Sequence, residues 1–221
     1  SVEILRWWVE ETDYSIAVDG GWRCFAEAGL LPEVLIGDAD SFPSFEKVAD
    51  KETKVSVHRI FDQETTDFEK ALDWLDSRTS PEEIVILGGL GGRSDHLCTN
   101  LMIASRIDPQ RLVVFDGHEE WIRRITPECP LSLRGRKGAT LSLLPLVPCK
   151  GVTAKGLRWN LSGESLSATG KLGQSNLCDS DEVVVSCREG VLFAVVLKRT
   201  LVFLMIPNPK KRPCRESRAF G

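Results

Sequence analysis

Acidic residues follow several of the strands that the first half of the sequence predicts. Asp19 comes directly after the first apolar run, and Asp38 and Asp40 come after the second. Asp95 follows a third, strongly apolar run. Because ligands bind outside the carboxyl ends of the strands in an open parallel sheet, we expect these carboxylates to converge on one edge. Clustered carboxylates repel one another and favour a hard cation, and Mg²⁺ is held by carboxylates together with substrate phosphates.

The sharpest of these elements is the turn Gly-Asp-Ala-Asp-Ser at residues 37–41. Asp38 and Asp40 stand two residues apart on this turn, so both carboxylates can point at one metal ion. A surface turn rich in Asp and Ser explains the segment equally well when it is taken alone. The acidic residues at the other strand ends favour the metal-binding interpretation.

A helix predicted over residues 65–75 carries a second polar group. Spacings of three and four place Gln63, Thr66, Asp67 and Lys70 on one face, opposite an apolar stripe. Without context, a solvated polar face is the favoured interpretation, since every amphipathic helix has one. Thr66 and Glu69 are also spaced for a capping box at the start of the helix.

The third element is a glycine-rich run that reads Gly-Gly-Leu-Gly-Gly-Arg-Ser-Asp-His at residues 88–96. Glycines let the backbone approach a phosphate closely, and a following helix offers its N-terminal N–H groups. Arg93 has the geometry for a bidentate bond to phosphate. The run matches neither a Walker P-loop nor the dinucleotide-binding fingerprint. The alternatives are a flexible turn in which Ser94 caps the helix and a structural role for His96.

The order of predicted elements divides the chain into two parts. Strands and helices alternate through residue 115, which predicts a mostly parallel sheet with helices on both faces. From about residue 129 only strands follow, the last of them at residues 201–206. We therefore expect an α/β plus all-β fold: an open α/β domain at residues 1–127, then a small β-sandwich domain at residues 128–221.

Composition narrows the classes of protein further. Hydrophobic residues make up 42% and charged residues 27% of the 221 residues, which is ordinary globular composition. The net charge of −4 gives no broad basic surface for nucleic acid. Seven cysteines without a C-x-x-C pair fit a reducing compartment, so we expect a cytoplasmic protein. The sequence shows no signal peptide and no apolar run of about 20 residues, so we expect neither export nor a membrane span. Residues 210–221 are expected to be a frayed tail.

Taken in order, the motifs resemble those of the thiamin pyrophosphokinase family. The resemblance rests on Asp-Gly-Gly at 19–21, Gly-Asp-x-Asp-Ser at 37–41, Asp-Gln-x-x-Thr-Asp at 62–67, the glycine-rich run at 88–96, Gly-Leu-x-Trp at 156–159, and Ser-Asn at 175–176. Two departures stand out. The strand and glycine loop that usually precede Asp-Gly-Gly are expected to be absent or truncated. Gly173 stands where relatives often carry a small hydroxyl residue.

The resemblance implies transfer of a diphosphate from ATP to the hydroxyethyl group of thiamin, with Mg²⁺ as cofactor and AMP as second product. It implies Mg²⁺ ligation by Asp38, Asp40 and Asp67, which are the catalytic residues together with Arg93 and Asp95. The implied ATP-binding residues are Asp19, Gly20, Gly21, Ser41, Gln63, Thr66, Lys70, Gly91, Gly92, Arg93 and His96.

For thiamin, the resemblance implies stacking on Trp159 and hydrogen bonds from Ser175 and Asn176 to the pyrimidine. From the residues alone, Trp159 is better explained as a core aromatic. The resemblance also implies a homodimer whose active sites are shared between the subunits. Two other functions stay open. One is a related pyrophosphokinase acting on a hydroxymethylpterin-type heterocycle, and the other is a non-catalytic thiamin or nucleotide sensor.

Overall fold

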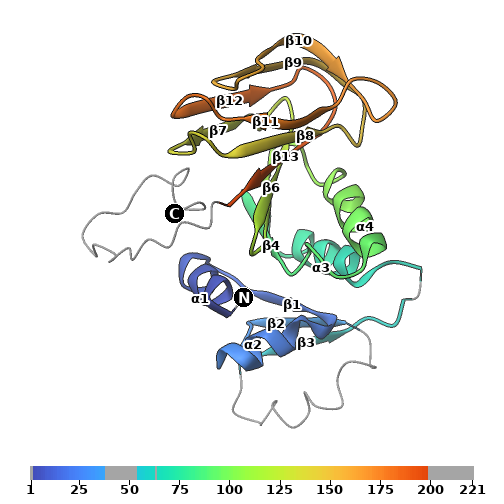
Figure 1. Cartoon of the computed structure of the whole chain (residues 1–221). Helices are drawn as coiled ribbons and strands as arrows, with labels where there is room; N and C mark the ends of the chain where they lie inside the picture. The colour runs from blue at the N-terminus through green and yellow to red at the C-terminus, as the bar shows by residue number, and fades with distance from the viewer. Residues whose placement is uncertain (1, 38–53, 63, 199–221) are drawn as a thin grey trace. The chain divides into compact units, whose positions relative to one another are not determined.

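The structure, a computed structural model, describes residues 2–37, 54–62 and 64–198, which form two compact units (Figure 1). The units are Ser1–Pro81 and Glu82–Gly221. Each is described separately below. The division expected at 127/128 followed the change to an all-β pattern, whereas contacts group the elements from residue 82 onward with the later strands. The expected boundary therefore stays a prediction.

The first unit is a small parallel α/β layer. Its elements are α1 (Val2–Glu11), β1 (Ile16–Val18), the short 3₁₀ turn η1 (Asp19–Gly21), α2 (Trp22–Ala28), β2 (Val34–Gly37), β3 (Ser56–Arg59) and α3 (Asp67–Asp76). The strands pair in parallel in the order β1-β2-β3. Val34, Leu35 and Ile36 of the central strand are fully buried. Helix α3 packs on β1 and β2, and its Ala71 joins the same apolar cluster as Val34 and Ile36.

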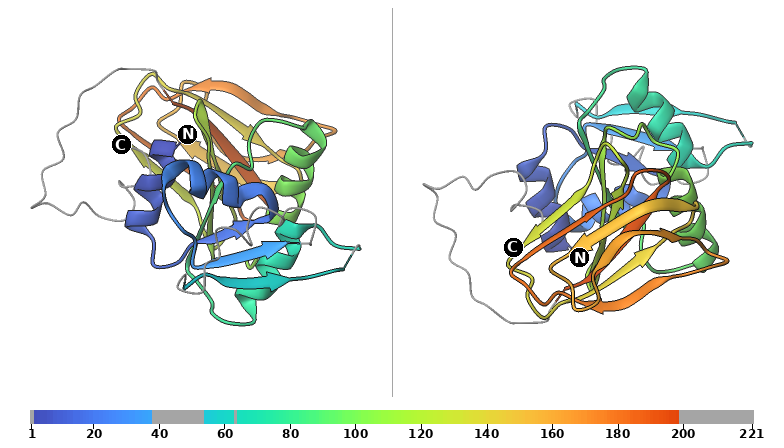
Figure 2. Two further views of the ribbon diagram at one scale, coloured as in Figure 1. Left: turned by 90° about the horizontal axis from the view of Figure 1, so that it is seen from below. Right: turned by 90° about the horizontal axis from the view of Figure 1, so that it is seen from above.

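The second unit begins with a parallel pair and continues as antiparallel sheet. Its elements are β4 (Glu83–Leu87), α4 (Ser94–Ala104), β5 (Leu112–Asp116), β6 (Glu120–Ile125), β7 (Leu131–Arg134), β8 (Thr140–Leu144), β9 (Cys149–Lys155), β10 (Leu161–Leu166), β11 (Gly173–Leu177), β12 (Glu182–Ser186) and β13 (Leu192–Leu197). One sheet has the order β11-β8-β13-β6-β5-β4 and the other β10-β9-β12-β7. Helix α4, green in Figure 2, lies beside the strands of this unit in both views.

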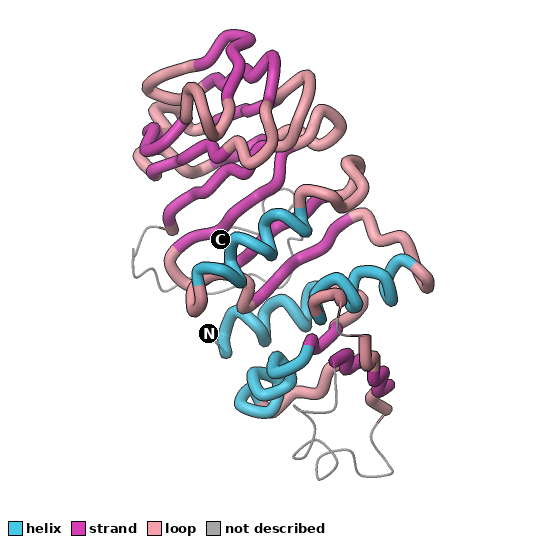
Figure 3. Tube along the Cα trace, turned by 90° about the vertical axis from the view of Figure 1, so that its right-hand side faces the viewer, coloured by secondary structure: helices cyan, strands magenta, loops and turns pink. Residues whose placement is uncertain are grey.

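The two sheets of this unit pack face to face as a sandwich. Figure 1 shows β9, β10 and β12 in one layer and β8 and β13 in the other. Buried side chains from both sheets form one cluster, with Leu141 and Leu192 from the first sheet and Val152 and Val185 from the second. Alternating burial along β8 and β12 is typical of strands with one face on a core. Within residues 120–198, the tube view shows strands and loops only (Figure 3).

A buried arginine fixes α4 to the sheet. Arg124 on β6 is 1% exposed. Its Nη1 donates to the carbonyl oxygen of Ala104 at 3.0 Å and to that of Ile107, and its Nη2 donates to those of Asp108 and Arg111 at 2.6 and 2.8 Å. Burial lowers the pKa of this guanidinium from its ordinary value. The cation satisfies carbonyl groups at and beyond the C-terminus of α4, where such groups lack helical partners.

The predicted class is confirmed, and the structure adds one correction to the expected sheet. The parallel strands do not all belong to one sheet: β1, β2 and β3 form their own, while β4 and β5 belong to the larger sheet of the second unit. β5 pairs antiparallel with β6 across the turn that starts at Gly117, and this pairing continues the sheet into the sandwich. The strand predicted at residues 201–206 lies outside the described residues.

Candidate functional site

Asp19, Gly20 and Gly21 form the tight turn that joins β1 to α2. Asp19 has a φ of 45°, a left-handed conformation that Asp tolerates better than most residues. A Cβ built on Gly20 or Gly21 meets nothing within 4 Å, so the backbone of this turn is open to its surroundings. The structure therefore places a carboxylate and accessible peptide groups at the carboxyl end of β1, as the sequence predicts.

The expected metal turn is only partly covered by the structure. Asp38, Asp40, Ser41 and Gln63 lie outside the described residues. Gly37, which precedes them, ends β2 and is buried. Among the described residues there is no group of three or more His, Cys, Asp or Glu side chains that could hold a metal ion. The magnesium assignment of Asp38 and Asp40 therefore stays a prediction.

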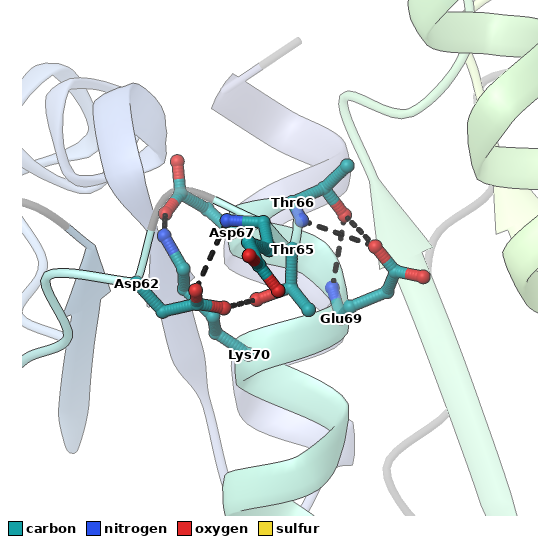
Figure 4. A network of polar contacts seen from close by, with 7 residues as sticks. Asp62, Thr65, Thr66, Asp67, Glu69 and Lys70 are labelled. Carbon is teal, nitrogen blue, oxygen red and sulfur yellow. Dashed lines mark hydrogen bonds and ion pairs between the residues drawn. The ribbon is translucent and has the colours of Figure 1, made fainter.

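The start of α3 carries a capping box (Figure 4). The Thr66 hydroxyl accepts from the Glu69 N–H at 3.2 Å, and Glu69 Oε2 accepts from the Thr66 N–H at 3.0 Å. Just upstream, Asp62 accepts from the Glu64 N–H at 3.0 Å and from the Thr65 hydroxyl. These bonds, led by that from Thr65, lower the pKa of Asp62. The Asp-Gln-x-x-Thr-Asp motif thus builds the turn that opens the helix, which is the structural alternative considered for Thr66 and Glu69.

On the polar face of α3, Thr66 is exposed but Asp67 and Lys70 are partly or fully buried. Lys70 is only 6% exposed and donates to Asp67 Oδ1 at 3.0 Å, while the Asp67 side chain is 29% exposed. A buried ammonium group needs a paired carboxylate, because an unpaired charge is costly in a poorly hydrated position. Figure 4 shows both side chains at the same end of α3. Asp67 and Lys70 therefore form one unit, with Asp67 at the more exposed end.

The glycine-rich run lies between β4 and α4 and has the backbone that only glycine adopts easily. Gly88, Gly91 and Gly92 have φ angles of 73°, 84° and 69°. At Gly89 a Cβ would lie 2.9 Å from a ring carbon of Phe115. The first half of the run is therefore packed on the sheet. At Gly91 and Gly92 a Cβ would meet nothing within 4 Å, so the second half is open.

Arg93 and Asp95 bind each other at the N-terminus of α4. Arg93 Nε donates to Asp95 Oδ1 at 3.1 Å, and Nη2 donates to Oδ2 at 2.6 Å. The bond from Arg93 lowers the pKa of Asp95 to about 2 and raises that of Arg93. Both side chains are exposed, as is His96. Ser94 is the first residue of the helix and Arg93 holds the cap position, so the alternative in which Ser94 caps α4 is wrong.

Trp159 lies on the loop between β9 and β10 with 60% of its side chain exposed. It is therefore not a core residue, contrary to the interpretation favoured by the sequence alone. Gly156, which opens the loop, has a φ of 82°, and a Cβ there would lie 2.1 Å from the Glu182 carbonyl oxygen. Arg158 lies beside the indole, with its guanidinium carbon 5.9 Å from the ring centroid.

Ser175 and Asn176 differ in what their side chains do. Ser175 is exposed and has a φ of 56°, and its N–H donates to the Ser142 hydroxyl at 2.9 Å. Asn176 is 9% exposed, and its amide bonds the backbone of Trp159. The structure thus places the backbone of Trp159 next to Asn176 and leaves the Ser175 hydroxyl as the more accessible polar group.

Sequence reasoning missed one carboxylate that belongs beside the glycine-rich run. Asp116 ends β5 opposite Leu87, is 6% exposed and pairs with Lys198 at 2.5 Å. The adjoining Gly117 approaches Leu90 of the run, since a Cβ on Gly117 would lie 3.0 Å from Leu90 Cδ1. The signal was present, because Asp116 follows an apolar strand in the same manner as Asp19 and Asp38.

The site residues fall into three described groups. One comprises residues at the end of β1 and at the start of α3 in the first unit, the second is the glycine-rich run with α4, and the third is the Trp159 loop with β11. Comparison with known proteins gives these groups a common context. Residues 5–115 match the family model described as thiamin pyrophosphokinase, catalytic domain, and residues 128–192 match the vitamin B1 binding domain of the same enzyme. The chain belongs to the thiamin pyrophosphokinase family.

Individual members of the thiamin pyrophosphokinase family are similar to this chain in sequence and in structure. Thiamine pyrophosphokinase 1 of Oryza sativa subsp. japonica is 29% identical over 177 residues, covering 76% of this chain and 67% of the relative. Thiamin pyrophosphokinase 1 of Caenorhabditis elegans is 26% identical over 200 residues, covering 84% and 79%. The crystal structure of thiamine pyrophosphokinase from Bacillus subtilis aligns with a TM-score of 0.67 and 25% identity, covering 81% of this chain and 85% of that one.

Proposed function

We propose that this protein is a thiamin pyrophosphokinase, an enzyme that transfers a diphosphate group from ATP to the hydroxyethyl group of thiamin. The products are thiamin diphosphate and AMP. The observation that carries this conclusion is the presence, in one chain, of matches to both the catalytic domain and the vitamin B1 binding domain of that enzyme. A match to the vitamin B1 binding domain does not favour the alternative of a pterin-type acceptor.

On the phosphate side, transfer requires positioning and charge neutralisation more than covalent chemistry by the protein. The open backbone at Gly91 and Gly92 and the N-terminal N–H groups of α4 offer donors to phosphate oxygens. Arg93 is exposed and forms a bidentate bond with a carboxylate, a geometry that suits phosphate equally. Besides Gly91, Gly92 and Arg93, we assign the following residues to the ATP site: Asp19, Gly20, Gly21, Thr66, Lys70 and His96, and, outside the described residues, Ser41 and Gln63.

The residues present fit a magnesium ion in chemical type. Asp67 offers a hard carboxylate ligand at 29% exposure beside the charge of Lys70, and Asp38 and Asp40 would supply two more from the turn outside the described residues. When bound there, Mg²⁺ supplies neutralisation of the phosphate charge. Lys70 holds the Asp67 carboxylate at the end of α3, so that this ligand is oriented before nucleotide arrives.

On the thiamin side, the exposed indole of Trp159 is the feature that suits the substrate. Thiamin carries a cationic thiazolium ring, and cations are attracted to the face of an indole. The side chain has 60% of its surface exposed and can therefore accept a ring without rearrangement of a core. The exposed Ser175 hydroxyl is the polar group that we assign to the pyrimidine.

We further propose a homodimer in which each active site takes its phosphate residues from one subunit and Trp159 with Ser175 from the other. The division of the site residues between an acidic, glycine-rich half and a β-sandwich half supports this arrangement. A cytoplasmic location is supported by the cysteines, because Cys24, Cys98, Cys129, Cys149, Cys178 and Cys187 are all free thiols. Within the described residues no helix is long and apolar enough to cross a membrane.

A substrate panel tests the proposed function. The purified protein is incubated with ATP and Mg²⁺ and either thiamin, a hydroxymethylpterin or no acceptor, and AMP is quantified. We expect AMP only with thiamin. If AMP forms with the pterin and not with thiamin, the protein is a pyrophosphokinase for a pterin-type acceptor. If the protein binds thiamin but no acceptor yields AMP, it is a sensor.

A further inference from the structure

The Asn176 side chain makes two hydrogen bonds to the backbone of one other residue, Trp159, and a third to Leu177. Its Oδ1 accepts from the Trp159 N–H at 3.1 Å and from the Leu177 N–H at 2.8 Å, and its Nδ2 donates to the Trp159 carbonyl oxygen at 2.7 Å. An amide oxygen has two lone pairs and the amide nitrogen two hydrogens, so three of four bonds are already made. The partners also fix the orientation of the amide, because a backbone N–H requires an acceptor and a carbonyl requires a donor.

The strand that carries Asn176 is bent in a way that directs its side chain to this position. β11 pairs with β8 at Gly173 opposite Leu143 and again at Asn176 opposite Leu141, so β11 carries an extra residue between these pairs. Ser175 adopts the left-handed φ of 56° in this bulge. Bulges of this kind redirect the side chains that follow them. The Asn176 side chain is accordingly 9% exposed, whereas Ser175 beside it is exposed.

The other hydrogen bonds of this loop hold the residues around Trp159, and Leu157 is buried in the sandwich core. Asn160 Oδ1 accepts from the Leu157 N–H at 3.0 Å, and the Arg158 N–H donates to the Leu177 carbonyl oxygen at 2.8 Å. The indole itself is largely exposed, so little packing fixes its direction. An exposed ring binds a ligand well only when its orientation is set in advance, because ordering it during binding reduces affinity.

We propose that Asn176 is a positioning residue that holds Trp159 as a preformed platform for thiamin, and that it acts through Trp159 and not as a ligand of the pyrimidine. This inference rests on the proposed function for the identity of the ligand. The clamp on Trp159 is a property of the free protein. The neighbouring Ser175 hydroxyl, on the exposed side of the same bulge, is then the direct polar contact.

The clamp itself is tested without any ligand by hydrogen exchange of the Trp159 backbone amide, measured by NMR. In the wild-type protein we expect this amide to be protected although its side chain is exposed, since its N–H is bonded to a buried oxygen. Asn176→Ala should accelerate its exchange at least tenfold while amides of β8 and β13 keep their rates. Unchanged exchange at Trp159 in the variant would overturn the clamp.

The route of action is tested by a double-mutant cycle read out as the dissociation constant for thiamin, measured by calorimetry. Asn176→Ala should weaken thiamin binding about tenfold, as expected for the loss of several buried hydrogen bonds, and leave the KM for ATP unchanged. If Asn176 acts only through Trp159, adding Asn176→Ala to Trp159→Ala should weaken binding no further than Trp159→Ala alone. Multiplicative effects of the two substitutions would identify Asn176 as an independent ligand and overturn the proposal.

Asp179→Asn is the matched control. Asp179 lies 3.5 Å from the guanidinium of Arg158 in the same loop cluster, but both side chains are half exposed and neither holds the Trp159 backbone. An exposed ion pair of this kind contributes little, so thiamin binding should stay within about twofold of wild type. A tenfold loss in this control would show that any disturbance of the loop has the same effect and would contradict a specific role for Asn176. Failure of the wild-type protein to bind thiamin would instead refute the proposed function, while amide exchange would still decide whether the clamp exists.

Discussion

Under the proposed function, the pair formed by Arg93 and Asp95 holds a guanidinium ready for an anion. Each bond in the pair joins a guanidinium N–H to a carboxylate oxygen, so Asp95 occupies a position that a phosphate oxygen can take. The carboxylate also accepts from the His96 N–H at 3.0 Å at the start of α4, where backbone N–H groups favour negative charge. Asp95 therefore orients Arg93 in the absence of nucleotide.

The ionisation of Asp95 gives a prediction at this scale. Its pKa of about 2 lies below the ordinary value of 3.8, chiefly because Arg93 donates to the ionised form. A carboxyl group whose pKa is lowered by folding adds stability at pH values above 3.8, and this contribution is lost as the pH falls toward 2. We expect an NMR titration of the Asp95 carboxyl carbon to have its midpoint near 2, and Arg93→Ala to move it toward 3.8. An unchanged midpoint in Arg93→Ala would contradict the pairing.

The metal assignment is tested at Asp40. Asp40→Asn should abolish diphosphate transfer while the thermal transition stays near that of wild type, because a neutral amide is a much poorer magnesium ligand than a carboxylate. Asp50→Asn is a matched control, since it removes one carboxylate from the same segment outside the Gly-Asp-x-Asp-Ser motif. Activity of Asp40→Asn close to that of the control at ordinary magnesium concentrations would refute the role of Asp40.

Among the elements, α3 combines a structural start signal with the candidate site. The capping box formed by Thr66 and Glu69 fixes the start of the helix. Asp67 and Lys70, which pair with each other, lie on the first turns of the same helix. The polar residues at the start of α3 therefore include both a capping box and candidate site residues. The cap fixes where the helix starts, and this start places Asp67 on the first turn.

The cap is tested by substitution of Thr66. Thr66→Ala should lower the free energy of unfolding by about 1 kcal/mol, the usual effect of removing an N-cap hydroxyl. Thr66→Ser keeps the hydroxyl and should lose little. Urea titrations of the two variants measure the difference. If both variants are equally stable, the hydroxyl does not cap α3. Lower turnover in Thr66→Ser at unchanged stability would point to a separate contact of the threonine with nucleotide.

The elements that were predicted and those that were not differ in physical type. β4 and β8 can be recognised in the sequence, because short apolar or alternating runs between turn residues are strong signals of strands. β10 and β11 were not predicted, since Leu-Ser-Gly-Glu-Ser-Leu and Gly-Gln-Ser-Asn-Leu are polar and contain glycine. These segments form strands because they pair with β9 and β8, and this pairing compensates for their low intrinsic strand propensity.

The same limit applies to the candidate site. The motif residues could be found from their order in the sequence, but the state of their side chains could not. Nothing in the sequence places Lys70 in a buried position, exposes Trp159 or turns Asn176 toward a backbone, because each depends on pairing and packing between distant segments. The Asp116–Lys198 pair joins residues more than 80 positions apart and is of the same kind.

At the scale of the whole molecule, the proposed dimer predicts rescue between two defective variants. Asp40→Asn removes the phosphate half of every site and Trp159→Ala the thiamin half, so each alone should be nearly inactive at low thiamin concentration. In a mixed dimer, one site combines an intact phosphate half with an intact thiamin half. About half of randomly assembled dimers are mixed and each has one working site of two, so roughly a quarter of wild-type activity should return.

Co-expression with two different affinity tags allows the mixed dimers to be isolated and assayed. If isolated mixed dimers are as inactive as the separate variants, each thiamin site lies within a single chain. Recovery that depends on the presence of both variants in one dimer supports the shared site. A mixture of the two separately purified proteins, tested before exchange of subunits, is the control.

The central claim, diphosphate transfer from ATP to thiamin, is tested most directly by identifying the products by ³¹P NMR. The protein is incubated with thiamin, ATP and Mg²⁺, and the phosphorus signals are followed over time. We predict that thiamin diphosphate and AMP accumulate in equal amounts and that neither forms without thiamin. Formation of thiamin monophosphate with ADP, or the absence of any thiamin-dependent product from protein that is folded and binds ATP, would contradict the account.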